Sequence, residues 1–157
     1  PVVYAQGALA YFSIKKQDFS KGIDLLKDEK NYKIAIANPK TSPYGKATVE
    51  AMKNAGIYEA VKSKLVFAES ISQTLSYAVT ATEISVVSKS SLYSSKMLQY
   101  KENVHWASLD ASIYAPIDQG IVLLKSAQYA QDYKAFYDFI LGDKAKAILK
   151  KYGYIVQ

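Results

Sequence analysis

The sequence predicts an α/β fold with a largely parallel sheet, because short apolar strands alternate with amphipathic helices along most of the chain. The clearest strands are residues 32–37, 65–68 and 83–88, and the first two each lead into a stretch with apolar residues at helical spacing. Half of the 157 residues are hydrophobic and 22% are charged. This composition indicates a globular chain with a single buried core.

The first elements are a strand and a short helix. Residues 8–14 form an apolar strand, and a short helix spans residues 19–27 after a polar connection. The preceding residues 1–4 resemble the middle of a fold, with neither an initiator Met nor a signal peptide. Because a signal peptide is removed from a mature protein, its absence excludes no compartment.

The best-defined helix follows the strand at residues 32–37. Asn38 and Pro39 end that strand, since proline has no N–H to donate. The helix then runs over residues 44–55, and Gly56 ends it. Its apolar positions fall on one face and are Tyr44, Ala47, Ala51, Met52 and Ala55.

The remaining elements continue this alternation. They are a short helix at 57–62, a helix after Ser70 with Ile71, Leu75, Ala78 and Val79 on one face, a short helix at 89–96, a strand at 104–109 and a strand at 117–125 in which 121–124 is buried. Two helices close the chain. One face of the first consists of Tyr129, Tyr133, Phe136, Tyr137 and Ile140, and Asp143 caps the second, which ends at Lys151.

The composition excludes several kinds of chemistry. There is no cysteine, so disulfides, thiolate nucleophiles and cysteine-ligated metals are excluded. His105 is the single histidine, and it stands beside Trp106 on a predicted strand, where a packed role is the simpler interpretation. No phosphate-binding, dinucleotide-binding or hydrolase motif occurs. We therefore expect no enzyme, and an enzyme using His105 is kept only as an alternative.

The charge pattern bears on the partners. All 20 basic residues are lysine, against 14 acidic residues, and the net charge is +6. Nucleic-acid readers use arginine for bidentate contacts, so we expect no nucleic-acid partner. A positive surface of this kind favours encounters with small anions.

Two strand-to-helix junctions could bind an anion. The strand ending at Ala37 and the strand ending at Ala68 each lead into a helix, with Ser42 and Ser70 at the cap positions. Helix N-termini carry unpaired N–H groups and a partial positive charge, and parallel strands place such starts at one edge of the sheet. A third strand ends at Ser88. Ordinary capped helices are the alternative interpretation.

Four segments together resemble the periplasmic molybdate-binding proteins of ABC importers. They are IAIANPKTSPYGKATVEAMKNAGIYEAVKSKLVFAESISQT (34–74), TEISVVSKSSLYS (82–94), YAPIDQGIVLLK (114–125) and AFYDFILGDKAKAILKKYGYIV (135–156). The resemblance implies a type II periplasmic binding-protein fold that holds a tetrahedral oxyanion between two lobes. It also implies no cofactor and no metal ion, because molybdenum enters only as molybdate.

The resemblance implies specific contacts. By position, Tyr44 and Ile71 match the family positions that donate main-chain N–H groups to the anion, and the hydroxyls of Ser42 and Ser70 lie beside them in sequence. Ser88 stands where some members contact the anion through a tyrosine hydroxyl. These five residues are the predicted anion site.

The resemblance also implies how the chain is divided. Residues 1–10 would be a hinge or crossover strand, 11–116 a complete second lobe, and 117–157 the return strand and C-terminal helices of a first lobe that is only partial. We expect a truncated form that lacks the family's N-terminal part and binds weakly or not at all. The exposed C-terminal helices would then favour a homodimer.

The implied function is capture of molybdate or tungstate by the periplasmic component of an ABC importer, with the membrane permease as partner. Selection against sulfate would depend on cavity size, because all three anions are tetrahedral dianions. The alternative is the ligand-sensing effector domain of a transcriptional regulator, which can have the same fold.

Overall fold

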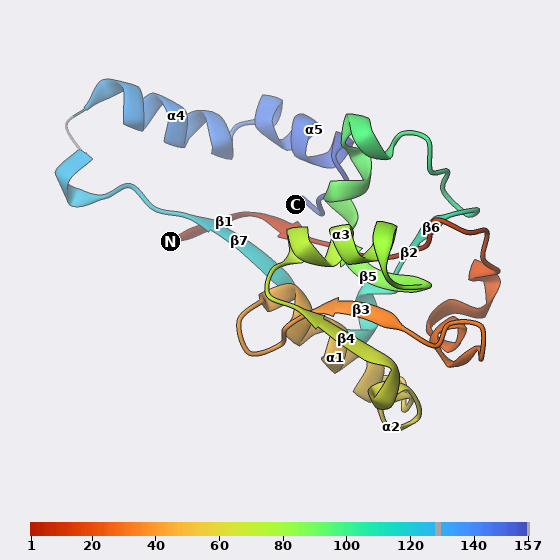
Figure 1. Ribbon diagram of the computed structural model, residues 1–157. Helices are drawn as coiled ribbons and strands as arrows, with labels where there is room; N and C mark the ends of the chain where they lie inside the picture. The colour runs from red at the N-terminus through yellow and green to blue at the C-terminus, as the bar shows by residue number, and fades with distance from the viewer. Residues whose placement is uncertain (128–129, 157) are drawn as a thin grey trace.

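The computed structural model describes residues 1–127 and 130–156, and it has two parts (Figure 1). The first, which we call the body, is a five-stranded sheet with helices on both faces. The second, which we call the ribbon, is a two-stranded antiparallel sheet that extends from the body with the last two helices beside it. Tyr129, expected on the face of the first C-terminal helix, lies outside the described residues.

The sheet of the body is mixed. Its strands are β2 (Leu9–Phe12), β3 (Ile34–Ala37), β4 (Leu65–Ala68), β5 (Ile84–Ser88) and β6 (Trp106–Ser108), in the order β4-β3-β5-β2-β6. β3 is parallel to β4 and β5, whereas β2 is antiparallel to β5 and β6. The prediction of a largely parallel sheet is therefore wrong for the β2–β6 side. β2 enters this sheet directly from the ribbon, and antiparallel neighbours need no helical crossover.

Helices cover both faces of this sheet. The α-helices of the body are α1 (Pro43–Asn54), α2 (Tyr58–Val61) and α3 (Ile71–Thr80), and its 3₁₀ helices are Phe19–Lys27, Lys62–Lys64, Lys89–Tyr93, Ser95–Met97 and Ala111–Ile113. α1 and α3 lie on opposite faces (Figure 1). Alternate side chains of β2 divide accordingly: Leu9 and Tyr11 join the core cluster that contains Met52 of α1, and Ala10 and Phe12 join the one that contains Ala78 of α3.

The strand expected at residues 104–109 is shorter in the structure. Asn103 has a φ of 60°, and the N–H groups of Val104 and His105 both donate to the carbonyl of Lys101 in a turn. The turn uses the imidazole too, because His105 Nδ1 accepts from Lys101 N at 3.0 Å. The ring also packs edge-on against Tyr100, with 5.5 Å between the ring centroids. These contacts give His105 a structural role in the turn.

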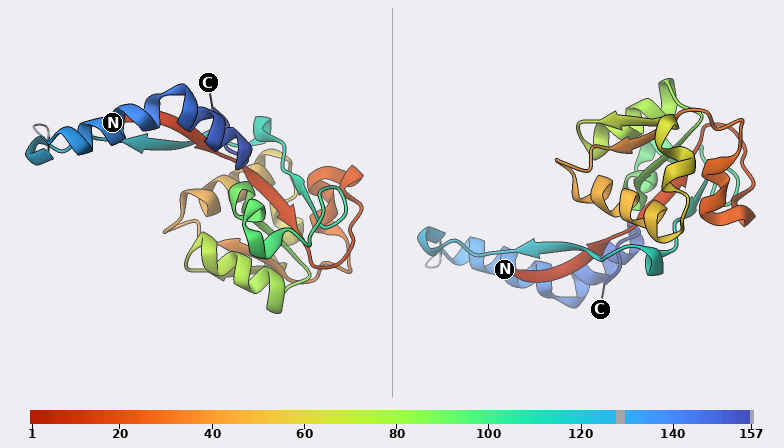
Figure 2. Two further views of the ribbon diagram at one scale, coloured as in Figure 1. Left: turned by 90° about the horizontal axis from the view of Figure 1, so that it is seen from above. Right: turned by 90° about the horizontal axis from the view of Figure 1, so that it is seen from below.

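The ribbon pairs the beginning of the chain with its later part. β1 (Val2–Gly7) is antiparallel to β7 (Ile117–Ile121), and a 3₁₀ helix at Lys125–Ala127 follows. The helices α4 (Gln131–Leu141) and α5 (Asp143–Lys151) run along the ribbon (Figure 2). The tail then returns to β1, where Gln6 and Ile155 exchange backbone hydrogen bonds of 2.8 and 2.9 Å.

Two details of the ribbon differ from the sequence prediction. β7 ends at Ile121, and the following Val122 and Leu124 are 54% and 64% exposed, so this segment is not a buried strand. Asp143 is not the cap of the last helix but its first residue. Gly142, whose extended backbone (φ −86°, ψ 165°) suits the position, takes the cap without a side-chain hydrogen bond.

The outer end of the ribbon exposes an apolar face. Tyr133 and Phe136 of α4 are 62% and 60% exposed. A groove of about 590 Å³ runs between α4 and the chain after β7. None of the helices in the described part of the chain is long and apolar enough to cross a membrane.

Candidate functional site

The first component of the site is the start of α1. Ser42 has extended backbone and caps the helix, and its Oγ accepts from Gly45 N at 3.4 Å. Pro43 occupies the first helical position, where its missing N–H costs nothing. The N–H of Tyr44, next in the chain, has no hydrogen-bond partner within residues 1–127 and 130–156. The Ser42 hydroxyl still has its hydrogen available to donate.

Gly45 brings α1 close to the end of β3. A Cβ built on Gly45 would lie 2.7 Å from the carbonyl carbon of Ala37 and 2.9 Å from that of Asn38. A side chain at this position would push the helix off the strand end. Sequence reasoning missed the role of this glycine, although its place directly after Pro43 and Tyr44 is a signal that could have been used.

Asn38 organises the loop between β3 and α1. Its carbonyl oxygen accepts from Thr41 N at 3.1 Å and Ser42 N at 2.9 Å, and its Oδ1 accepts from Lys40 N at 3.0 Å. The loop is therefore held by one residue, as is typical of asparagine in turns. Sequence analysis used Asn38 only to end the strand, and the Asn-Pro pair carries the turn signal.

The second component is the start of α3. Ser70 caps this helix, and its Oγ accepts from Gln73 N at 3.1 Å. Gln73 Oε1 in turn accepts from Glu69 N at 2.7 Å, so the predicted capping arrangement forms one residue earlier than in the usual box. Within the described residues, the N–H of Ile71 has no partner.

These two helix starts are neighbours. Ala37 pairs with Ala68 in the parallel β3–β4 ladder, and Asn38 N donates to the Ala68 carbonyl at 2.7 Å. Thr41 Oγ1 lies 3.5 Å from the Glu69 carbonyl oxygen, which joins the two loops again. In Figure 1 both strand ends face the side from which the ribbon extends. The sheet thus brings the starts of α1 and α3 to one edge, with their positive helix ends together.

Ser88 lies at the end of the next strand. β5 is parallel to β3, and Ser88 is its last residue, paired with Leu9 and 6% exposed. Strand alternation places its side chain on the face of Val86, the face that α1 covers. Its carbonyl accepts from Ser91 Oγ at 2.7 Å, while its hydroxyl makes no hydrogen bond with any described residue.

The side chain of Tyr44 lies against Gly7, with the phenols of Tyr154, Tyr114 and Tyr4 nearby. Burial raises the pKa of Tyr44 from 10.0 to about 12, with smaller contributions from Tyr154, Tyr114 and Tyr4. The Tyr44 side chain therefore stays in its neutral phenol form at neutral pH. The donors at the ends of β3 and β4 are main-chain N–H and serine hydroxyl groups.

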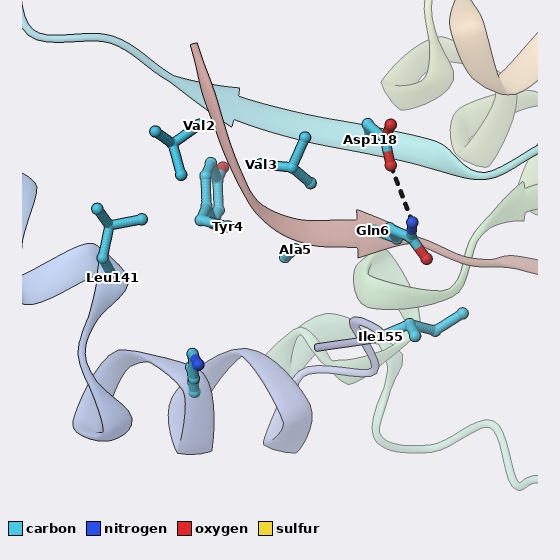
Figure 3. A pocket seen from close by; sticks show the side chains of 9 residues that line it. Val2, Val3, Tyr4, Ala5, Gln6, Asp118, Leu141 and Ile155 are labelled. Carbon is cyan, nitrogen blue, oxygen red and sulfur yellow. Dashed lines mark hydrogen bonds between the residues drawn. The ribbon is translucent and has the colours of Figure 1, made fainter. Parts of the chain in front are cut away.

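The cavity beside the ribbon lacks a comparable set of donors. The cavity between β1 and α5, of about 510 Å³, is lined mostly by apolar side chains, and among the lining side chains Gln6 Nε2 donates to Asp118 Oδ1 at 2.9 Å (Figure 3). No group of three His, Asp or Glu side chains gathers anywhere in the parts of the chain that the structure describes. The junction of α1 and α3 is therefore the candidate site.

Comparison with known proteins gives consistent matches over the whole chain. Residues 1–155 match the family model described as bacterial extracellular solute-binding protein. The molybdate-binding protein ModA of Rhodobacter capsulatus is 34% identical over 155 residues, which are 98% of this chain and 59% of that protein. ModA of Azotobacter vinelandii is also 34% identical, over 98% of this chain and 60% of that protein.

A solved structure matches as well. The periplasmic molybdate-binding protein of Azotobacter vinelandii superposes with a TM-score of 0.84 and 26% sequence identity, over 99% of this chain and 68% of that one. The chain thus spans about 60% of the length of the curated relatives it matches.

Proposed function

Because this chain belongs to the family of bacterial extracellular solute-binding proteins, we propose that the junction of α1 and α3 binds a tetrahedral oxyanion, molybdate or tungstate. The observation that carries the proposal is the pair of unpartnered N–H groups, at Tyr44 and Ile71, on adjacent helix starts of the described chain. The fold is that of the type II periplasmic binding proteins. Proteins that resemble this chain are named for molybdate binding, which supports the choice of anion.

The chemistry of the junction suits a dianion. Two helix N-termini each contribute a partial positive charge without a proton that could be lost, so the site keeps its charge over a wide pH range. Ser42 and Ser70 accept within their caps and can each donate a hydroxyl hydrogen outward, and Ser88 adds a third hydroxyl. Selection of molybdate over sulfate would then depend on the size of the space between these donors.

We expect weak binding by this chain alone. Hydrogen bonds to a charged group contribute about 1.5–3 kcal/mol each, so an anion that is gripped from one side only forfeits several powers of ten in affinity. All five proposed contacts come from the body. Donors on a facing lobe would supply the remainder, with residues 1–10 as the crossover, 11–116 as the second lobe and 117–157 as part of the first.

The test is a titration of the ¹⁵N-labelled chain with molybdate, followed by amide NMR. The expected result is a saturable shift of the Tyr44 and Ile71 amide signals at millimolar molybdate and a smaller response to sulfate. If neither amide responds, the proposed site is wrong. Submicromolar affinity by calorimetry would contradict the expectation of weak binding.

As a cellular role, we propose the substrate-binding component of an ABC importer that works in the periplasm with a membrane permease. The relatives are solute-binding proteins rather than enzymes, and they support this role. The effector-domain alternative stays a prediction that no observation on this chain favours.

We also propose that the apolar face of α4 pairs two copies of the chain. The face combines exposed Tyr133 and Phe136 with a groove, and β7 is an edge strand of the ribbon that a second ribbon can pair with. Light scattering should give a dimer mass that Tyr133→Ser lowers to the monomer. Tyr32→Ser is the matched control, because Tyr32 is equally exposed at 62% but lies on the body. A monomer in the unaltered chain would contradict the pairing.

A further inference from the structure

Tyr44 connects the anion site to the passage between body and ribbon. Its main-chain N–H is one of the free donors at the proposed site, and its side chain reaches Gly7, the last residue of β1. A Cβ built on Gly7 would lie 2.8 Å from Tyr44 Cζ and closer still to the hydroxyl oxygen. Gly7 is therefore the position that leaves room for the ring.

Gly7 begins one of the two segments by which the chain passes between the ribbon and the body. This segment runs from β1 into β2, and in it the Ala8 carbonyl accepts from Lys89 N at 2.8 Å. The other segment leads from Tyr114 into β7. The two are joined, because Leu9 N donates to Tyr114 Oη at 3.1 Å in a buried hydrogen bond. A displacement of Gly7 is thus carried to both segments.

The surroundings of the ring are consistent with a mechanical role. Tyr44 packs against the core cluster that contains Leu9, Tyr114 and Ile117, so three residues of the two connecting segments share a core with it. Tyr4 of β1 and Tyr154 of the tail lie close enough to the phenol to influence its ionisation. The Tyr44 ring, the two connecting segments and the tail therefore lie close together in one packed unit.

We propose that Tyr44 is a positioning residue that couples anion binding at its own N–H to the placement of the ribbon relative to the body. An anion that draws on the Tyr44 amide shifts the first turn of α1, and the ring transmits this shift to Gly7. Coupling of this kind is reciprocal: the placement of the ribbon alters the anion affinity by the same factor by which the anion alters that placement, so a change at Gly7 that disturbs the placement also changes the affinity. The inference rests on the proposed anion site.

The test extends the molybdate titration to variants. In the unaltered chain, we expect the Gly7 and Leu9 amides to shift along the same saturation curve as Tyr44 and Ile71. Gly7→Ala should weaken molybdate binding about 5-fold or more, the lower end of typical couplings. Gly120→Ala is the matched control in the same ribbon, since its Cβ would lie 3.5 Å from its nearest neighbour and should leave the affinity unchanged.

A second variant keeps the test decisive if Gly7→Ala fails to fold. Tyr44→Ala retains the main-chain N–H but removes the ring, so molybdate should still shift the amides of residues 44 and 71 and no longer those of Gly7 and Leu9. Tyr44→Phe keeps the ring and should transmit the shift.

The outcomes separate the two proposals. If Tyr44 and Ile71 do not respond in the unaltered chain, the anion site itself is wrong. If they respond while Gly7 and Leu9 stay unchanged, or if Tyr44→Ala still transmits the shift, the coupling is overturned and the anion site stands.

Discussion

At the scale of single residues, Gly45 is the position where a side chain would be most disruptive. Gly45→Ala should lower the free energy of unfolding by about 1–3 kcal/mol, because the new Cβ meets the backbone of Ala37 and Asn38 rather than a flexible side chain. This loss outweighs the roughly 1 kcal/mol that alanine gains over glycine in a helix. Urea unfolding measures the change. Gly120→Ala serves as control, and equal stability of the two variants would contradict the prediction.

Tyr44 gives a prediction about pH. Burial raises its pKa in the folded chain from 10.0 to about 12, so the unfolded phenol ionises first as the pH rises. The stability that this residue contributes is therefore fully present below pH 10.0 and is lost as the pH rises toward about 12. Tyr44→Phe should reduce the drop in the urea midpoint over this interval. If the urea midpoint of Tyr44→Phe falls as much as that of the unaltered chain, burial does not raise the pKa of the Tyr44 phenol.

Sequence reasoning at this scale found the residues whose role is local. Ser42 and Ser70 could be predicted as caps because a cap acts within three residues of its own position. Gly45 was missed, because its requirement comes from the carbonyl of a strand that ends several residues earlier. The contact between Gly7 and Tyr44 was out of reach for the same reason.

At the scale of elements, the cap of α3 can be tested against a neighbour. Ser70→Ala should cost about 1 kcal/mol of unfolding free energy, since Gln73 N loses its acceptor. Ser72→Ala is the matched control in the same first turn, because the Ser72 hydroxyl makes no hydrogen bond within the described chain. Chemical denaturation measures the free energy of unfolding of both variants. Similar losses of free energy in Ser70→Ala and Ser72→Ala would argue against a capping role for Ser70.

The elements around the site were the most predictable. β4 has the bounds that the apolar pattern indicated, α3 begins after Ser70 as expected, and α1 begins and ends one residue earlier than expected. The antiparallel placement of β2 was not visible in the pattern, because buried strands look alike in parallel and antiparallel sheets. The strand predicted at residues 117–125 is longer than β7, because an apolar sequence does not show whether another layer covers it. Val122 and Leu124 are apolar, yet no layer of the described chain covers them.

At the scale of the whole molecule, removing one oxygen atom, Tyr114 Oη, should weaken the link between the two segments that connect body and ribbon. Tyr114→Phe removes the acceptor of the buried Leu9 N–H, which should cost about 1–3 kcal/mol of unfolding free energy. Hydrogen exchange of the Leu9 amide should accelerate with it. Tyr77→Phe is the control, since the Tyr77 hydroxyl has no hydrogen-bond partner among the described residues. An unaltered exchange rate would mean that water replaces the phenol.

Periodicity in the sequence did not indicate the ribbon, and the division at residues 1–10, 11–116 and 117–157 that the resemblance implies stays a prediction. The pairings that define the ribbon join Gln6 to Asp118 and to Ile155, so the partners are far apart in sequence. Local patterns carry no record of such pairings. The junction of α1 and α3, by contrast, depends on two strand ends whose register is set by neighbouring βα units, and for that reason the sequence could indicate that the two helix starts are neighbours. That this junction binds an anion stays a prediction.

The pairing of Gln6 with Ile155 also orders events during synthesis. Every strand of the body lies between Leu9 and Ser108, so that sheet can assemble while the last third of the chain is still being translated. β1 must wait for β7, and its bridge to the tail forms only after residue 155 has left the ribosome. The sheet that carries the junction of α1 and α3 can therefore form first, whereas β1 stays unpaired until β7 has been synthesised.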